Sequence, residues 1–158
     1  MKKKIRRKVG DVVSIPLGDD HYTFGRVLKG RLMAFYDYSS IEEPTIAEII
    51  SKPVMFRVWV TDEPIVNGRW PVIGNVPLED WLTEKVWFYK QDAISKLLTL
   101  YPSDSIGEEI PATLEQCRGL ENAALWRIMH IESRLQDHFA GQDNKWVAFD
   151  KSELEKSK

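Results

Sequence analysis

Apolar and polar positions alternate along residues 12–17, and a period of two residues is typical of a β-strand with one buried face. The Gly-Asp-Asp triplet at 18–20 favours a tight turn, because glycine accepts positive φ and aspartate bonds readily to nearby backbone. A second strand is predicted over residues 22–28, where Gly25 indicates a bulge. The opening segment therefore predicts a bulged β-hairpin.

Further strand patterns follow the hairpin. Residues 32–38 are rich in aromatic side chains and extend it to a three-stranded meander. Residues 54–60 give the strongest strand pattern, with apolar side chains on both faces. The Asn-Gly pair at 67–68 is a strong hairpin signal and predicts that residues 69–74 pair with this strand. A short strand is also predicted at residues 86–89.

Helical spacing appears before and after this region. The isoleucines within residues 45–51 predict one short helix, and the spacing of Ile94, Leu97 and Leu98 predicts a brief second one that ends near Pro102.

The main helix is predicted near the C-terminus. Thr113 and Gln116 fit a capping box at a helix start. Apolar residues then recur at steps of three and four from Leu120 to Phe139, which predicts a long amphipathic helix that Gly141 ends. Residues 146–149 suggest a last short strand.

These elements predict an α+β fold: a small, curled, barrel-like (SH3-like) and mostly antiparallel sheet, with one main C-terminal amphipathic helix and one or two short helices. A chain of 158 residues has the usual size of one domain. We expect residues 9–150 to form that domain, residues 1–8 to be a disordered basic arm, and residues 151–158 to be a charged tail.

Charge and cysteine content narrow the class of protein. Six of the 22 basic residues and none of the 24 acidic ones lie in the first eight positions, so the rest of the chain is strongly acidic. An acidic body suits a basic protein partner better than nucleic acid. The single cysteine favours a reducing compartment, and Asp11 interrupts any signal peptide. No run approaches the ~18 apolar residues of a membrane span. We therefore expect a soluble, cytoplasmic protein.

The candidate chemistry argues against an enzyme. Cys117 and His130 are too far apart to form a nucleophile and base if one continuous helix carries both. His130 and His138 are eight positions apart, which is too far to share one metal ion. Phosphate-binding loops and hydrolase motifs do not occur. No catalytic residue, metal or cofactor is predicted.

Six tryptophans are many for this length, and most should build the core. Trp70, beside a turn and a proline, is the best candidate for an exposed anchor, with a core position as the alternative. The adjacent acid pairs at predicted turns are the other candidates for partner contacts, and we expect these carboxylates to flank an aromatic anchor and to meet a basic surface. They are Asp19, Asp20, Glu42 and Glu43.

The stretch from Val9 to Leu28 resembles the N-terminal signature of the immunity protein 26 family of bacterial polymorphic toxin systems. Later pieces are also similar, so that the resemblance spans roughly residues 9–146. These pieces are Gly68-Arg69-Trp70, Ile73-Gly74, Val86-Trp87 and residues 119–126, followed by His130 and Arg134.

The resemblance implies a cytoplasmic antidote that binds and neutralises a cognate toxin, without a cofactor and without turnover. The acidic body suits a basic toxin such as a nuclease. It carries no residue-level inhibitory motif, and the basic arm is not part of its pattern. Two alternatives stay open. One is a nucleic-acid-binding module that uses exposed aromatic residues and the basic arm. The other is an endoribonuclease-like toxin on a similar barrel, with His21 or Arg26 supporting the activity.

Overall fold

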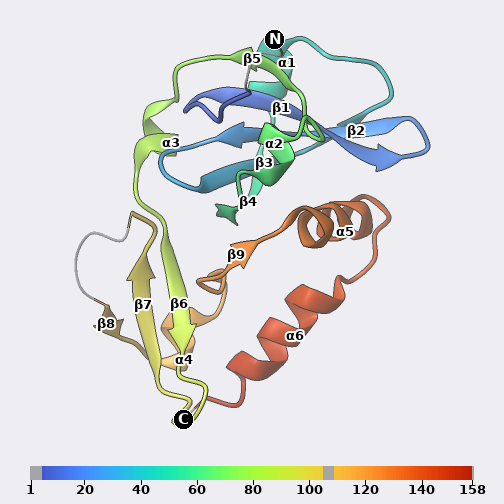
Figure 1. The fold of residues 1–158 in the computed structure, drawn as a ribbon. Helices are drawn as coiled ribbons and strands as arrows, with labels where there is room; N and C mark the ends of the chain where they lie inside the picture. Colours follow the sequence, from blue (N-terminus) through green and yellow to red (C-terminus); the bar gives the residue numbers. More distant parts are fainter. Residues whose placement is uncertain (1–4, 105–108, 158) are drawn as a thin grey trace.

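The computed structural model describes residues 5–104 and 109–157, and these form two β-sheets with six short or medium helices (Figure 1). The larger sheet has six strands and the smaller sheet has three. In spatial order the larger sheet contains β5 (Val72–Asn75), β1 (Asp11–Gly18), β2 (His21–Val27), β3 (Leu32–Ser40), β4 (Val54–Val60) and β9 (Leu125–Trp126). The smaller sheet contains β6 (Trp87–Gln91), β7 (Leu98–Pro102) and β8 (Ile110–Pro111).

Strands β1 to β4 form an antiparallel meander, as their alternating patterns predict. The register shifts next to Gly25 where β2 pairs with β3, which confirms the expected bulge. Strand β5 pairs with β1, however, and not with β4. The predicted hairpin through residues 67–68 is therefore wrong: Asn67 caps helix α2 (Glu63–Val66), and the chain then crosses to the other edge of the sheet.

The larger sheet is open. Strands β5 and β9 lie at its two opposite edges, and β9 joins β4 in parallel. No pairing between the edge strands closes a barrel within the residues that the structure describes. The α+β class and the mostly antiparallel pairing are thus confirmed, whereas the barrel closure is not observed.

The C-terminal third differs most from the prediction. The capping box at Thr113 is present, but its helix, α4 (Leu114–Cys117), has one turn only. Gly119 then takes a φ of 86°, and β9 follows before helix α5 (Ile128–Phe139) begins. The predicted strand at residues 146–149 is instead part of helix α6 (Lys145–Leu154), which Asn144 caps. Two C-terminal helices therefore replace the single long one.

Three short helices, α1 (Ile46–Ile50), α2 and α3 (Asp80–Thr83), lie in the segments that follow the strands of the larger sheet. Helix α1 confirms the short helix predicted after the meander, with Thr45 accepting a hydrogen bond from the Glu48 amide at 3.2 Å. Helices α2 and α3 were not predicted. The brief helix expected around Ile94 is a turn that leads into β7.

Helix α5 covers one face of the larger sheet, and Figure 1 shows it beneath the strands. Ile131 and Leu135 are buried among side chains of β1 to β4, Ile65 and Trp70. Burial of such side chains contributes about 1.5–3 kcal/mol each. The core of the meander therefore includes a helix that lies far along the chain.

A buried arginine fixes the other side of the sheet. Arg26 has no exposed surface, and its guanidinium donates to the carbonyls of Gly10, Val76 and Pro77 at 3.1, 2.7 and 3.0 Å. It also pairs with Glu79 at 3.2 Å. A buried charge is tolerated only with such partners, so Arg26 holds the loop between β5 and α3 against the meander.

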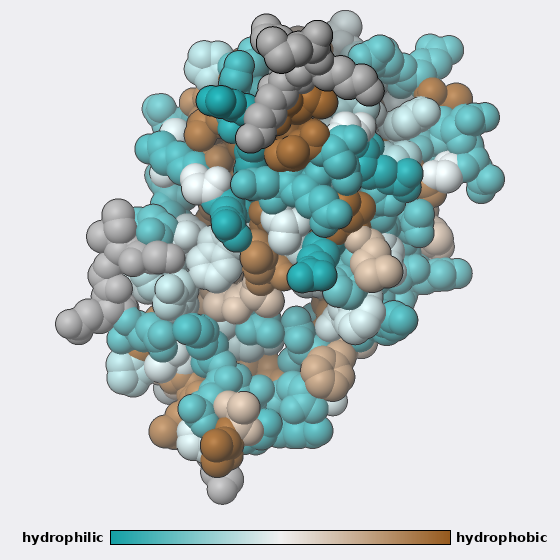
Figure 2. Space-filling model, in the orientation of Figure 1, coloured by the Kyte–Doolittle hydropathy of each residue, from teal (hydrophilic) through white to brown (hydrophobic). Residues whose placement is uncertain are grey.

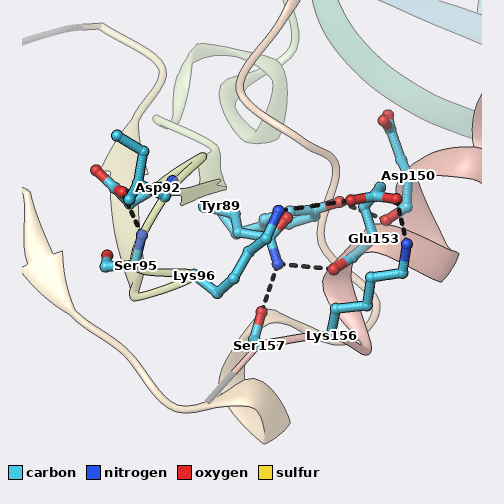
Figure 3. Close-up of polar contacts among 10 residues, drawn as sticks. Tyr89, Asp92, Ser95, Lys96, Asp150, Glu153, Lys156 and Ser157 are labelled. Carbon is cyan, nitrogen blue, oxygen red and sulfur yellow. Dashed lines mark hydrogen bonds and ion pairs between the residues drawn. The ribbon is translucent and has the colours of Figure 1, made fainter.

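Helix α6 is held against the smaller sheet by polar contacts (Figure 3). Gln91 of β6 donates to the Glu153 carbonyl and to the Ser157 hydroxyl, each at 2.7 Å. The Glu153 carboxylate lies 3.6 Å from the Lys96 ammonium and 2.8 Å from that of Lys156. The first part of the segment predicted to be a charged tail is thus helical and docked.

The N-terminal segment is also partly anchored. The Arg7 side chain donates to the carbonyls of Val60 and Leu32 at 2.7 and 3.0 Å and pairs with Asp62 at 3.2 Å. Within the predicted disordered arm, Arg7 therefore lies against the end of the sheet. Residues 1–4 lie outside the described residues.

Candidate partner-binding surface

The four acidic residues predicted to meet a partner lie at one end of the larger sheet. Asp19 and Asp20 form the turn between β1 and β2, and Glu42 and Glu43 follow the end of β3. Because Tyr22 at the start of β2 pairs with Ser40 at the end of β3, the two acidic pairs extend from neighbouring strand ends. We call the surface formed by Asp19, Asp20, Glu42 and Glu43 the acidic end.

The turn at 18–21 has a specific backbone geometry. Gly18 pairs with His21, and the two intervening aspartates have φ values of 51° and 60°. A two-residue turn with both φ values positive suits the twist of a hairpin, and aspartate tolerates this conformation better than most residues. The turn therefore presents two adjacent carboxylates, and both are exposed.

The second acidic pair lies in the loop between β3 and α1. The Ser40 hydroxyl donates to the Glu42 carbonyl at 2.5 Å and fixes the start of this loop. An open cavity of about 510 Å³ lies at the end of β3 and is lined by His21, Ser39, Ser40, Ile41 and Glu42.

Two exposed apolar side chains accompany the carboxylates. Tyr22 is 40% exposed and Ile41 is 65% exposed. The sequence analysis did not single out either residue, although Ile41 stands as an isolated apolar residue between two serines and two glutamates. Figure 2 shows mainly hydrophilic residues at the edge where the β1–β2 hairpin projects in Figure 1. The acidic end thus combines charge with a small apolar contact area.

Trp70 is not an exposed anchor in this structure. Its side chain has no exposed surface, and its indole Nε1 donates to Glu132 Oε2 of α5 at 2.9 Å. Arg69 pairs with the same carboxylate through two hydrogen bonds of 3.0 and 2.8 Å. Trp70 therefore takes the core position that was the alternative, because α5 provides a buried acceptor for its indole.

The electrostatics at Glu132 agree with this structural role. Burial alone would raise the pKa of the carboxyl, but the hydrogen bonds from Arg69 and Trp70 outweigh it and hold the pKa below its usual range. The ionised carboxylate of Glu132 therefore links α5 to Arg69 and Trp70, which follow α2.

Comparison with known proteins assigns the chain to a family. The family model described as Immunity protein 26 matches residues 8–97, more than half of the chain. The chain belongs to the immunity protein 26 family. No curated protein and no solved structure matches it.

The immunity protein 26 match contains the whole acidic end, the meander, β5 and β6. It does not reach residues 119–134, which also contributed to the resemblance seen in the sequence. Helix α5, which fills the core of the larger sheet, therefore lies outside the matched segment.

Cys117, His130 and His138 of this immunity protein 26 member each have contacts within the fold. Cys117 is buried on α4, and burial raises the pKa of its thiol. His130 packs on Trp146 with ring centroids 4.5 Å apart, and His138 contacts Asp37 at 2.9 Å. The described part of the chain contains no group of three or more potential metal ligands.

His21 and Arg26, which the endoribonuclease alternative requires, have other contacts. The His21 Nδ1 lies 2.9 Å from the Asp19 carbonyl within the turn. Arg26 is fully buried and its hydrogen bonds are made within the fold. A buried guanidinium cannot contact a phosphate at the surface, so the structure gives this alternative no support. None of the described helices is long and apolar enough to span a membrane.

Proposed function

We propose that this protein neutralises a cognate toxin by binding it stoichiometrically through the acidic end, in the cytoplasm of the cell that makes the toxin. Membership of the immunity protein 26 family supports the toxin partner. The acidic end supports a partner with a basic surface, such as a nuclease whose active site binds phosphate.

One observation carries this proposal. None of the carboxylates of Asp19, Asp20, Glu42 and Glu43 makes an ion pair or side-chain hydrogen bond with the described residues. Elsewhere in the fold, by contrast, Glu79, Glu121, Glu132 and Glu155 each pair with an arginine. Four free carboxylates on one rigid sheet end form a negative surface that attracts a cationic one.

Tyr22 and Ile41 supply the apolar part of the proposed interface. Tyrosine is enriched at interface hot spots because it combines a large ring with a hydrogen-bonding group. Tyr22 is the second residue of β2, and its backbone position is fixed because it pairs with Ser40 of β3. In this proposal Tyr22 takes the anchor role that the sequence suggested for Trp70.

The test measures binding to the toxin domain encoded next to this gene, together with rescue of cells that express that toxin. The variant Asp19→Asn/Asp20→Asn removes two charges while asparagine keeps the positive-φ turn. Combined with Glu42→Lys/Glu43→Lys, it should weaken toxin binding by at least about a hundredfold, since interface charge reversals cost several kcal/mol.

The control is Glu84→Lys/Asp143→Lys, which makes the same two charge reversals as Glu42→Lys/Glu43→Lys at exposed acidic residues that are not part of the acidic end. This control should bind the toxin as tightly as the unmodified protein. Unchanged toxin affinity in the fourfold variant would refute the proposed surface, and absence of any toxin binding by the unmodified protein would refute the proposed function.

A further inference from the structure

The end of the larger sheet opposite the acidic end is basic. Strand β2 ends at Val27 and β3 begins at Leu32, and the turn between them carries Lys29 and Arg31. The side chain of Arg7 contacts the Leu32 carbonyl at this same end. Since β2 has seven residues, the two ends are separated by about 20 Å.

A cavity of about 650 Å³ opens beside this basic turn. It lies where the larger sheet, α3 and β7 meet. Its apolar wall includes Trp59 and Tyr101, whose rings meet edge to face at 87° with centroids 5.7 Å apart. Trp59 is held in place because its indole Nε1 donates to the Ser103 carbonyl at 3.0 Å. Three cations, Lys29, Arg31 and Lys85, line the same cavity.

The cavity keeps a net positive charge, because three cations line it together with one carboxylate, that of Asp104. Lys85 lies 3.8 Å from this carboxylate, whereas Lys29 and Arg31 make no ion pair with the described residues. The backbone N–H groups of Gly30 and Arg31 also have no hydrogen-bond acceptor within the described chain. Gly30, with a φ of 65°, has open space on the side where a Cβ would be. Cations and free amides in one turn suit an anion.

We propose that this cavity binds a nucleoside phosphate, with the phosphate at the turn of Lys29, Gly30 and Arg31 and the base against the aromatic wall. A volume of about 650 Å³ lies within the range of small-molecule sites. Aromatic rings beside cations bind nucleotide units, because the rings stack on the base and the cations pair with the phosphate. The inference goes beyond toxin binding and concerns the other end of the sheet.

The experiment compares three ligands by isothermal titration calorimetry at low ionic strength: adenosine monophosphate, adenosine and ribose 5-phosphate. Adenosine monophosphate should bind at least about tenfold more tightly than either fragment, because only it engages both the cations and the aromatic wall. A hexa-adenylate strand, tested in parallel, distinguishes a nucleotide unit of a strand from a free nucleotide as the source of the ligand. Equal or tighter binding of the strand identifies the strand as the source.

The variant Lys29→Glu/Arg31→Glu should weaken adenosine monophosphate binding by at least about tenfold. Lys145→Glu/Lys151→Glu makes the same charge change on α6, away from this cavity, and should leave the affinity unchanged. Because both pairs are exposed, circular dichroism and thermal melting should show both variants folded.

Three results would overturn the inference: no binding of adenosine monophosphate at millimolar concentration, equal affinity for ribose 5-phosphate, or equal losses in the two charge variants. The acidic-end variants provide a separate control. They should keep nucleotide binding while losing toxin binding, so failure of one proposal is distinguishable from failure of the other.

Discussion

The two ends of the larger sheet are built from the same strands but differ in shape as well as charge. At the acidic end, Tyr22 and Ile41 are exposed beside unpaired carboxylates, which suits contact with a protein surface. At the basic end, Lys29 and Arg31 line a cavity whose apolar wall includes Trp59 and Tyr101. The difference arises because the smaller sheet and α3 pack near only one end of the meander. A single antiparallel sheet thus presents two unlike surfaces.

Both ends depend on the folded sheet between them, and Trp70→Ala should destabilise that sheet. Loss of this buried ring should destabilise the protein by about 3–5 kcal/mol. Chemical denaturation measures the change. Trp81→Ala is the matched control, because Trp81 is 46% exposed, and it should cost less than about 1 kcal/mol. Similar losses for the two variants would contradict the core role of Trp70.

Tyr22→Ala should weaken toxin binding at the acidic end and leave the basic end unchanged. Loss of a hot-spot tyrosine weakens binding by about 2 kcal/mol, or roughly thirtyfold, mainly through faster dissociation. Surface plasmon resonance with the toxin would measure the rates. Val72→Ala on edge strand β5 is the control, because Val72 is 39% exposed and is not part of the acidic end. Equal dissociation rates for Tyr22→Ala and the unmodified protein would exclude Tyr22 as an anchor.

The link between the sheet and α5 should depend on pH. Because the folded-state pKa of Glu132 is lowered, its stabilising contribution is fully present above the unfolded pKa of about 4.3 and is lost as pH falls through the folded value. Glu132→Gln should cost about 1–3 kcal/mol at neutral pH. Urea titrations from about pH 3 to neutrality span the unfolded pKa. The free energies of unfolding of the two proteins should converge at the acidic end of this range. A constant difference across that range would disprove the charge-dependent link.

Asp150 should show a smaller effect of opposite sign. Burial raises the pKa of this carboxyl, the nearby Glu121 charge adds to the rise, and a hydrogen bond from Asn122 opposes it. The ionised form is therefore unfavourable in the fold, and the protein should gain stability as pH falls through the raised pKa towards about 3.9. Asp150→Asn should lack this gain in the same titrations and should be at least as stable as the unmodified protein at neutral pH.

Local chemistry made part of this fold predictable. The turn at Asp19-Asp20, the bulge at Gly25 and the capping box at Thr113 each depend on residues a few positions apart, and each is present. The placement of the acidic residues on neighbouring turns follows from the meander for the same reason. Strand alternation alone identifies which turns share an end of a sheet.

The errors have a common cause in contacts between distant residues. Strand β5 pairs with β1, and the buried indole of Trp70 donates a hydrogen bond to Glu132, which lies 62 positions later in the chain. The apolar run at residues 146–149 is too short for periodicity to distinguish a helix from a strand. In the structure Asn144 caps a helix that contains this run. The basic cavity was not predicted, because its lining residues are spread over the sequence from Lys29 to Leu125.

The position of α5 in the chain has a consequence for synthesis on the ribosome. All the residues of the meander and β5 have been translated by residue 75, but Ile131 and Leu135, which cover the apolar face of the sheet, come some 60 residues later. At bacterial elongation rates of about 5–20 residues per second, the sheet waits roughly 3–12 s for its covering helix. During that interval the nascent chain exposes the surface that α5 later buries, so the N-terminal half depends on the end of translation to become a finished fold.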